Sequence, residues 1–120
     1  MGEINSYKDL LVWQKSVKLV TSVYNLVKEF PEHEKFGLSQ QMRRSAVSIP
    51  SNIAEGWGRF SRKNYMQFLR IARGSLFELE TQIILAVNLE YINKDNTLEV
   101  EIIEISKMLN ALIRRLEEKV

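Results

Sequence analysis

Apolar residues recur at alternating intervals of three and four along most of this chain, and this spacing limits the fold more than any other feature. The strictest example runs from about Thr97 to Lys119, where the apolar residues follow heptad spacing. Such a period places them on one face of a helix. They are Leu98, Ile102, Ile105, Leu109, Leu112 and Leu116. We therefore expect an amphipathic helix here, with Asn96 and Glu99 as its capping box.

A first helix is predicted over about Tyr7–Glu29. Ser6 and Asp9 have capping-box spacing before it, and Phe30 and Pro31 end it because a residue before proline is disfavoured in the helical region. Its predicted core stripe is Leu10, Trp13, Val17, Val20, Tyr24 and Val27.

A second helix is predicted over about Leu38–Trp57, with Gly56 and Gly58 closing it. Its apolar face is Met42, Ala46, Ile49, Ile53 and Trp57. Pro50 lies inside this pattern, lacks a backbone N–H and clashes with the preceding turn, so we expect a kink. The alternative is that Pro50 divides the segment into two short helices.

A third helix is predicted over about Ser61–Leu89. Its core stripe is Tyr65, Leu69, Ala72, Leu76, Leu79, Ile83 and Ala86. Nothing reads as a strand or an internal repeat, and the connections are short and polar. The expected fold is all-α, a single domain over residues 1–120 built as an antiparallel up-down-up-down four-helix bundle.

The third helix also carries apolar residues outside its core stripe. Met66, Phe77 and Ile84 lie about a third of a turn away, and Gly74 lies nearly opposite the core, where close approach by another backbone or a ligand would explain a glycine. The first helix is widened in the same way by Leu19, Val23, Leu26 and Phe30. A wide core is one interpretation. We favour a self-association surface, because three large apolar residues on one outer stripe form a patch.

The net charge is only +2, but the charges are segregated along the sequence. Residues 35–75 contain eight basic residues and the single acid Glu55; the basic residues are Lys35, Arg43, Arg44, Arg59, Arg62, Lys63, Arg70 and Arg73. Residues 76–104 contain seven acids and one base; the acids are Glu78, Glu80, Glu90, Asp95, Glu99, Glu101 and Glu104. This asymmetry indicates an anionic partner or self-complementary association.

The basic residues suggest two functions. Arg59, Arg62, Lys63, Arg70 and Arg73 are expected along the outer side of the third helix, with few acids nearby in the sequence. The second helix adds Arg43 and Arg44. Such a row binds phosphates through charge and counterion release without reading base sequence. The alternative is that the basic half meets the acidic half of a neighbouring subunit.

Residues for enzymatic or metal chemistry are missing from the sequence. There is no cysteine, and His33 is the only histidine, so neither a zinc motif nor a His-activated nucleophile can be assembled within the chain. We therefore expect a non-enzyme without cofactor or metal. No secretory signal and no apolar stretch of about 20 residues is visible, which favours a cytoplasmic protein without membrane association.

A polar cluster surrounds Pro50. It consists of Ser45, Ser48, Ser51, Asn52 and Glu55. One interpretation is a small binding site at the kink. We favour the other, in which these side chains satisfy backbone groups that the proline leaves without partners.

The segment 43–56, RRSAVSIPSNIAEG, resembles the hallmark of the four-helix bundle protein family, also called 23S ribosomal RNA intervening-sequence proteins. Supporting motifs are LVWQK at 11–15, FP at 30–31, GLSQQ at 37–41, FLRIARGS at 68–75 and ELETQ at 78–82. They span nearly the whole chain in order, which makes the resemblance specific. Ser45 stands where family members commonly carry alanine.

The resemblance implies a bundle that assembles into a homopentameric barrel, in a family whose function is not established. The family is similar to the accessory variability determinant of diversity-generating retroelements, a basic pentameric barrel that binds nucleic acid and a reverse transcriptase. The partners implied are therefore further copies of the chain, nucleic acid and a protein such as a reverse transcriptase. The residues carried over are Arg43, Arg44, Arg59, Arg62, Lys63, Arg70 and Arg73.

Overall fold

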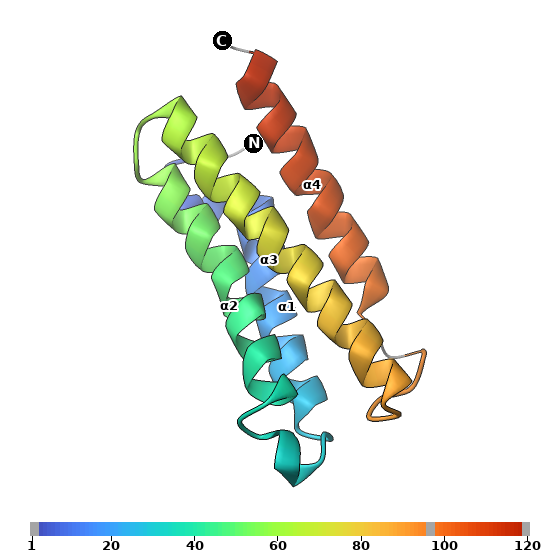
Figure 1. Cartoon of the computed structure of the whole chain (residues 1–120). Coiled ribbons are helices and arrows are strands. Elements are labelled where there is room, and N and C mark those ends of the chain that lie inside the picture. The colour runs from blue at the N-terminus through green and yellow to red at the C-terminus, as the bar shows by residue number, and fades with distance from the viewer. Residues whose placement is uncertain (1–2, 96–97, 119–120) are drawn as a thin grey trace.

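The computed structural model describes residues 3–95 and 98–118 of the chain. These residues form four α-helices, two short 3-10 helices and no β-strand, which agrees with the all-α prediction and is consistent with a four-helix bundle. The α-helices are α1 (Leu11–Val27), α2 (Leu38–Trp57), α3 (Arg62–Asn88) and α4 (Glu99–Glu118) (Figure 1). The 3-10 helices are η1 (Tyr7–Asp9) and η2 (Glu32–Glu34).

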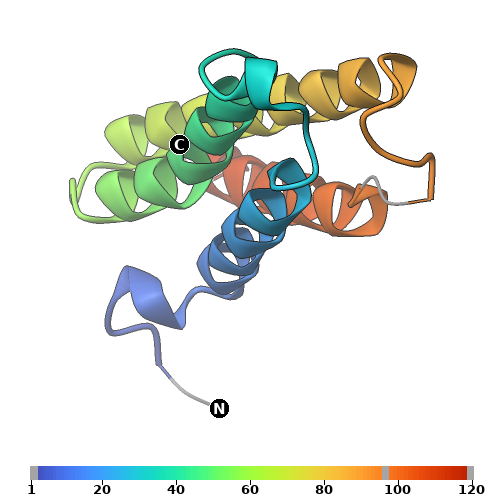
Figure 2. The same cartoon turned by 90° about the horizontal axis from the view of Figure 1, so that it is seen from below.

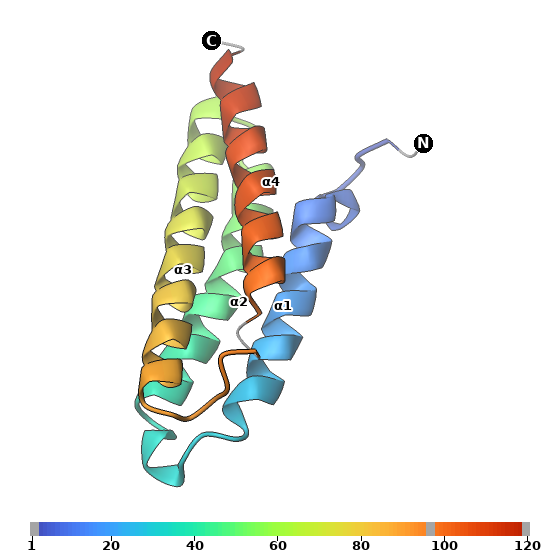
Figure 3. The ribbon, with the colours of Figure 1, turned by 90° about the vertical axis from the view of Figure 1, so that its right-hand side faces the viewer.

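Successive α-helices run in alternating directions (Figures 1 and 3). Seen from below, α2 and α3 form one layer, and α1 and α4 form the other (Figure 2). Residues 58–61, between α2 and α3, lie at one end of the molecule, which we call the turn end (Figure 1). The α1–α2 loop, residues 28–37, and the start of the α3–α4 connection, residues 89–95, lie at the opposite end, which we call the loop end (Figure 1).

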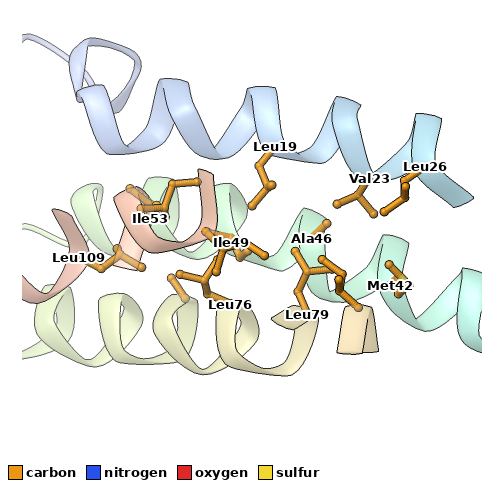
Figure 4. Packing of buried hydrophobic residues seen from close by; sticks show 14 of the residues in the cluster. Leu19, Val23, Leu26, Met42, Ala46, Ile49, Ile53, Leu76, Leu79 and Leu109 are labelled. Atoms are coloured by element: carbon orange, nitrogen blue, oxygen red, sulfur yellow. The ribbon is translucent and has the colours of Figure 1, made fainter. Parts of the chain in front are cut away.

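Aliphatic side chains from all four α-helices fill the space between the layers (Figure 4). Leu19, Ile49, Leu76 and Leu109 represent the four helices, and each is almost completely buried. Burial of one such side chain contributes about 1.5–3 kcal/mol. Apolar packing therefore holds the helices together. None of the described helices is both long and apolar enough to cross a membrane.

The α1 segment differs from the prediction at both ends. The capping box of Ser6 and Asp9 is present, but it caps η1, and the α-helix begins only at Leu11. The helix ends at Val27, so Phe30 lies in the loop, where it is buried against the core. The segment predicted as one helix over 7–29 therefore consists of the 3-10 helix η1, the α-helix α1 and the start of the following loop.

The predicted core stripe of α1 is wrong in part. Val17 and Tyr24 are exposed, whereas Leu19, Val23 and Leu26 are buried. Leu10, Trp13 and Val20 are half-buried at the edge of the core, and Val27 is buried. Apolar residues cover more than half the circumference of α1, so the neighbouring helices decide which of them face inward. Leu19, Val23 and Leu26, which were assigned to widen the stripe, are its centre.

The α2 helix has the predicted bounds and is continuous through Pro50, so the two-helix alternative is wrong. Met42, Ala46, Ile49 and Ile53 are fully buried, as predicted, and Trp57 is half-buried. Pro50 itself is buried. The kink stays a prediction.

The polar cluster around Pro50 mainly joins α2 to α3. The Ser45 hydroxyl, which is buried, lies 2.7 Å from Gln82 Oε1, and the Ser48 and Ser75 hydroxyls are 2.8 Å apart. Asn52 Nδ2 donates to the Ser48 carbonyl at 2.8 Å. Buried polar groups need such partners, because an unsatisfied one costs about 1–3 kcal/mol. These contacts support a structural role that differs from the predicted one: Ser45 and Ser48 bond α3, and Asn52 bonds the Ser48 carbonyl, whereas the carbonyl that Pro50 leaves without its donor is that of Ala46.

The predicted core stripe of α3 is confirmed, except that Tyr65 is only half-buried. In α4, Ile102, Ile105 and Leu109 are buried as predicted, and Ile113 is a further buried residue. The other predicted α4 core residues, Leu98, Leu112 and Leu116, are half-buried against the core. The predicted helix start at Thr97, its end at Lys119 and the capping box at Asn96 fall outside the described residues.

Candidate nucleic-acid interface

Two of the candidate phosphate-binding residues begin α3. Arg62 and Lys63 follow the N-cap Ser61, whose side chain accepts a hydrogen bond from the Asn64 N–H at 3.4 Å. Both basic side chains are exposed. Neither has a carboxylate oxygen within 4.0 Å among residues 3–95 and 98–118. Arg62 and Lys63 thus present their charges to solvent at the turn end.

Further along α3, the arginines are engaged by α4. Arg70 Nη2 lies 3.0 Å from Glu117 Oε2, and Arg73 Nη1 donates to Asn110 Oδ1 at 2.9 Å. Both partners are more than 35 positions away in the sequence. The expectation that the basic residues of α3 lack nearby acids is therefore wrong for Arg70. These two arginines join α3 to α4 while leaving part of their surface to solvent.

Arg59, at the turn end, is paired with Glu55 in the last turn of α2. Its Nη2 lies 2.6 Å from Glu55 Oε1, and its guanidinium lies 5.0 Å from the centre of the Phe68 ring. The ion pair has the helical i,i+4 spacing and is half-exposed, so it is worth less than about 1 kcal/mol. Phosphate can therefore compete for this arginine.

The α2 arginines differ from each other. Arg43 Nη2 donates to the Lys35 carbonyl at 3.3 Å, and its guanidinium lies 5.9 Å from the centre of the Tyr24 ring. Arg44 is exposed, and no described carboxylate lies within 4.0 Å of it. The candidate phosphate-binding residues do not form one open row. Arg44, Arg62 and Lys63 are open, and the others have partners within the chain.

The residues predicted as an oligomer interface also separate into two groups. Met66 is buried, so its assignment to the outer stripe is wrong: that flank of α3 faces α4, which is also where Arg70 and Arg73 find their partners. Phe77 and Ile84, farther along the same flank, are 48% and 56% exposed. Gly74 has open space where a Cβ would stand.

A groove of about 280 Å³ between α3 and α4 was not foreseen from the sequence. Its floor is apolar and its rim is charged. It is lined by Glu80, Ile83, Ile84, Val87, Asn88, Lys94, Glu99 and Ile102. Ile103, on α4, is also about half-exposed. Phe77, Ile84 and Ile103 are large apolar groups left open to solvent on these two helices, and we call them the α3–α4 apolar surface.

The loop end holds a polar cluster that the sequence did not reveal. The Tyr91 hydroxyl donates to Glu34 Oε2 at 2.8 Å, and His33 Nε2 lies 3.2 Å from the same hydroxyl. Glu34 Oε1 accepts from the Leu38 N–H at the start of α2, at 3.0 Å. The bonds from Leu38 and Tyr91 lower the pKa of Glu34 below its ordinary value, and the bond to Glu34 raises the pKa of Tyr91.

One aromatic residue at the turn end was also missed. Phe60 lies between α2 and α3 and is 91% exposed. The signal that could have identified it is a large apolar residue placed between Gly58 and the N-cap Ser61, outside every apolar stripe.

Comparison with known proteins places the chain in a family. Residues 8–111 match the family model described as 23S rRNA-intervening sequence protein. The fold is similar to the crystal structure of a protein with unknown function from the S23 ribosomal protein family of Bacteroides thetaiotaomicron, with a TM-score of 0.79 and 29% identity. That similarity covers 87% of this chain and 96% of the other. No curated protein matches the sequence at a significant level. Since the match spans most of the chain, the protein belongs to the 23S rRNA-intervening sequence protein family.

Proposed function

We propose that this protein is a non-enzymatic, oligomeric binding protein that contacts nucleic-acid phosphates through basic residues at its turn end. The observation that carries the proposal is that Arg62 and Lys63 are exposed and have no carboxylate partner in the described part of the chain. Arg59, three residues before Arg62, is held by a half-exposed ion pair and a contact with the Phe68 ring.

The physical chemistry favours binding without sequence preference. Lysine and arginine that neutralise phosphates release condensed counterions, so affinity falls steeply as salt rises. A contact to phosphate positions the protein but does not distinguish the bases. The proposal therefore predicts RNA and DNA binding that is strongest at low salt.

Charge reversal at two positions tests the proposal. Binding of fluorescent RNA and DNA oligonucleotides is measured by anisotropy at several salt concentrations, for the wild type and for the double variant Arg62→Glu, Lys63→Glu. The matched control is Lys18→Glu, Lys107→Glu, which changes two exposed lysines on α1 and α4 and alters the net charge equally. We expect at least about a tenfold loss of affinity for the first variant and a much smaller loss for the control. Equal losses, or binding that salt does not weaken, would contradict the proposal.

Arg70 and Arg73 are less suitable for this test. Each has a partner on α4, so reversing its charge changes the α3–α4 contact as well as the surface. Arg44 is exposed and unpaired in the described chain, but it lies six residues into α2, nearer the loop end than the turn end, so it tests whether the interface extends beyond the turn end. Arg44→Glu is expected to weaken binding less than the double variant, since it changes one charge instead of two.

A scaffold function is the second candidate, and the α3–α4 apolar surface favours it. Phe77, Ile84 and Ile103 are each about half-exposed, Ile84 lines the groove between α3 and α4, and exposed apolar surface of this kind marks sites of association. The self-assembly proposed here, including a pentamer, would cover this surface. A protein partner such as a reverse transcriptase stays a prediction.

Sedimentation velocity tests self-assembly. The double variant Phe77→Asp, Ile84→Asp is expected to dissociate the oligomer, because two charges would be buried in the contact without partners. Leu11→Asp is the control, since Leu11 is equally exposed but lies on α1. A wild-type chain that sediments as a monomer at every concentration would exclude the oligomer. It would leave phosphate binding to be decided by the charge-reversal experiment.

A further inference from the structure

Phe60 is the most exposed large apolar residue described in the molecule, with 91% of its surface open to solvent. It lies at the turn end, and its backbone has a φ of +57°. This left-handed region costs a residue with a Cβ roughly 1–2 kcal/mol, so glycine or asparagine is the usual choice. The chain thus carries a phenylalanine where neither burial nor backbone conformation favours one.

Helix termination does not explain this conformation. Glu90 also has a positive φ, of +64°, but this residue belongs to a Schellman motif that ends α3. In this motif the Tyr91 N–H donates to the Ala86 carbonyl and the Glu90 N–H donates to the Val87 carbonyl, both at 2.9 Å. The hydrogen bonds that end α2 are made by Gly58 and Arg59 and do not involve Phe60. An unfavourable conformation that local structure does not require points to a use for the side chain.

The surroundings of Phe60 are aromatic and basic. The Trp57 ring, half-buried at the end of α2, lies 6.4 Å from the Phe60 ring, centre to centre. Arg59 precedes Phe60, and the open cations Arg62 and Lys63 follow two and three positions later. The acid nearest in the sequence, Glu55, is already paired with Arg59. An exposed ring among cations is the arrangement with which proteins hold single-stranded nucleic acid, where bases stack on the ring and phosphates meet the charges.

We infer that the turn end binds unpaired nucleotides of single-stranded RNA or DNA, with a base stacked on Phe60 and the neighbouring phosphates held by Arg62 and Lys63. This inference rests on the proposed function and deepens it, because phosphate contacts alone do not separate single strands from duplexes. A base inside a duplex has both faces covered by its neighbours and cannot stack on Phe60. We therefore predict that the protein prefers unpaired bases to duplexes, and that the Phe60 side chain causes this preference.

The loop end supplies the matched control. Phe36 is likewise exposed, at 80%, but it lies in a loop that also carries Glu32 and Glu34, and the Lys35 ammonium lies 5.6 Å from its ring centre. Both acids precede Phe36 within four residues, and their negative charge opposes a phosphate backbone. Because basic residues follow Phe60 and acidic residues precede Phe36, we assign nucleic-acid binding to Phe60 and not to Phe36.

The experiment compares three probes of equal length, about 20 nucleotides, which exceeds a typical single-strand site. They are fluorescent oligothymidylate, the same phosphate chain with abasic sugars, and a duplex. Phe60→Gly, which removes the ring and relaxes the backbone, is expected to lower affinity for oligothymidylate about tenfold. Affinity for the abasic chain and the duplex, and the salt dependence of binding, are expected to stay unchanged. Phe36→Gly is expected to change none of these, and Phe60→Trp is expected to keep the wild-type affinity.

The outcomes separate the inference from the proposed function. If Arg62→Glu, Lys63→Glu abolishes binding but Phe60→Gly does not alter the preference between probes, the phosphate interface stands and the stacking inference is overturned. The inference also fails if Phe60→Gly weakens all three probes equally, or if it dissociates an oligomer, because the ring would then be covered by another copy of the chain. If the wild type binds no probe at low salt, both proposals fail.

Discussion

The two ends of the bundle are built in opposite ways. At the loop end, Phe30 is buried and its ring centre lies 5.4 Å from that of Tyr91, while Tyr91 bonds Glu34 across more than 50 residues of sequence. At the turn end, Phe60 is exposed and is followed in the sequence by Arg62 and Lys63, which have no carboxylate partner among the described residues. At the loop end Phe30, Tyr91 and Glu34 close the fold, whereas at the turn end Phe60, Arg62 and Lys63 are exposed. Groups left free are available for binding, which is why we place the interface at the turn end.

The largest effect is expected from truncation at the loop end. Phe30→Ala removes a buried ring that packs on Tyr91 and the core, and should lower the free energy of unfolding by about 3–5 kcal/mol. Chemical denaturation followed by circular dichroism measures this change. A loss below about 1 kcal/mol would mean that the loop end is not closed in this way.

A glycine under the turn end gives the next largest effect. A Cβ on Gly56 would lie 2.7 Å from Phe68 Cβ and 3.3 Å from the Tyr65 carbonyl, so α2 and α3 pack closely here. Gly56→Ala should therefore destabilise the protein by about 1–3 kcal/mol, since the helices must move apart. Gly74→Ala is the control and should have the opposite effect. No atom lies within 4 Å of the position that its Cβ would take, so we expect the free energy of unfolding to rise by about 0.5–1 kcal/mol. Equal effects of the two substitutions in urea denaturation would show that the helices are not in close contact at Gly56.

The Glu34 carboxylate makes the loop end sensitive to acid. Hydrogen bonds from Leu38 N–H and the Tyr91 hydroxyl lower its pKa in the folded chain below the ordinary value of 4.5. Its contribution is therefore fully present above the unfolded pKa and is lost as pH falls through the folded pKa. Stability measured between about pH 6 and about pH 3 should fall more for the wild type than for Glu34→Gln. If the stabilities of the wild type and of Glu34→Gln change with pH in parallel, the Glu34 carboxylate does not help to close the loop end.

The smallest effect on stability is expected at Phe60. Phe60→Gly removes an exposed ring and relieves a positive φ, which offsets the greater backbone freedom of glycine in the unfolded chain. The free energy of unfolding should change by less than about 0.5 kcal/mol. A loss of more than about 2 kcal/mol in thermal denaturation would show that Phe60 supports the fold, and the contrast between the ends would disappear.

The sequence was most informative where the pattern was narrow. On α2 one apolar stripe is flanked mainly by polar residues, so both the helix bounds and the fully buried residues could be predicted. On α3 the core stripe was also predicted, but Met66, which was assigned to a second, outer stripe, is buried. On α1 two apolar flanks compete, and the pattern alone selected the one that includes Val17 and Tyr24, which are exposed. Hydrophobic periodicity reports the orientation of residues relative to one another but does not say which neighbour covers them.

The candidate interface was predictable only in part for the same reason. Local sequence identified Arg62 and Lys63 as cations without nearby acids, and this holds among the described residues because they lie at an end of the bundle. Local sequence also identified Arg70 as a cation without a nearby acid, but in the folded chain Arg70 pairs with Glu117 of α4. Phe60 belonged to no stripe and had no signal beyond its place in a turn.

The amino-acid sequence by itself determined that the chain forms four amphipathic helices, because helical periodicity and capping depend on residues a few positions apart. Only the tertiary structure decided which flank of α1 is buried, which arginines of α3 are held by α4, and that the two ends of the bundle differ. Those outcomes depend on contacts between residues far apart in the sequence, such as Arg70 with Glu117 and Glu34 with Tyr91. Such contacts exist only after the helices have packed.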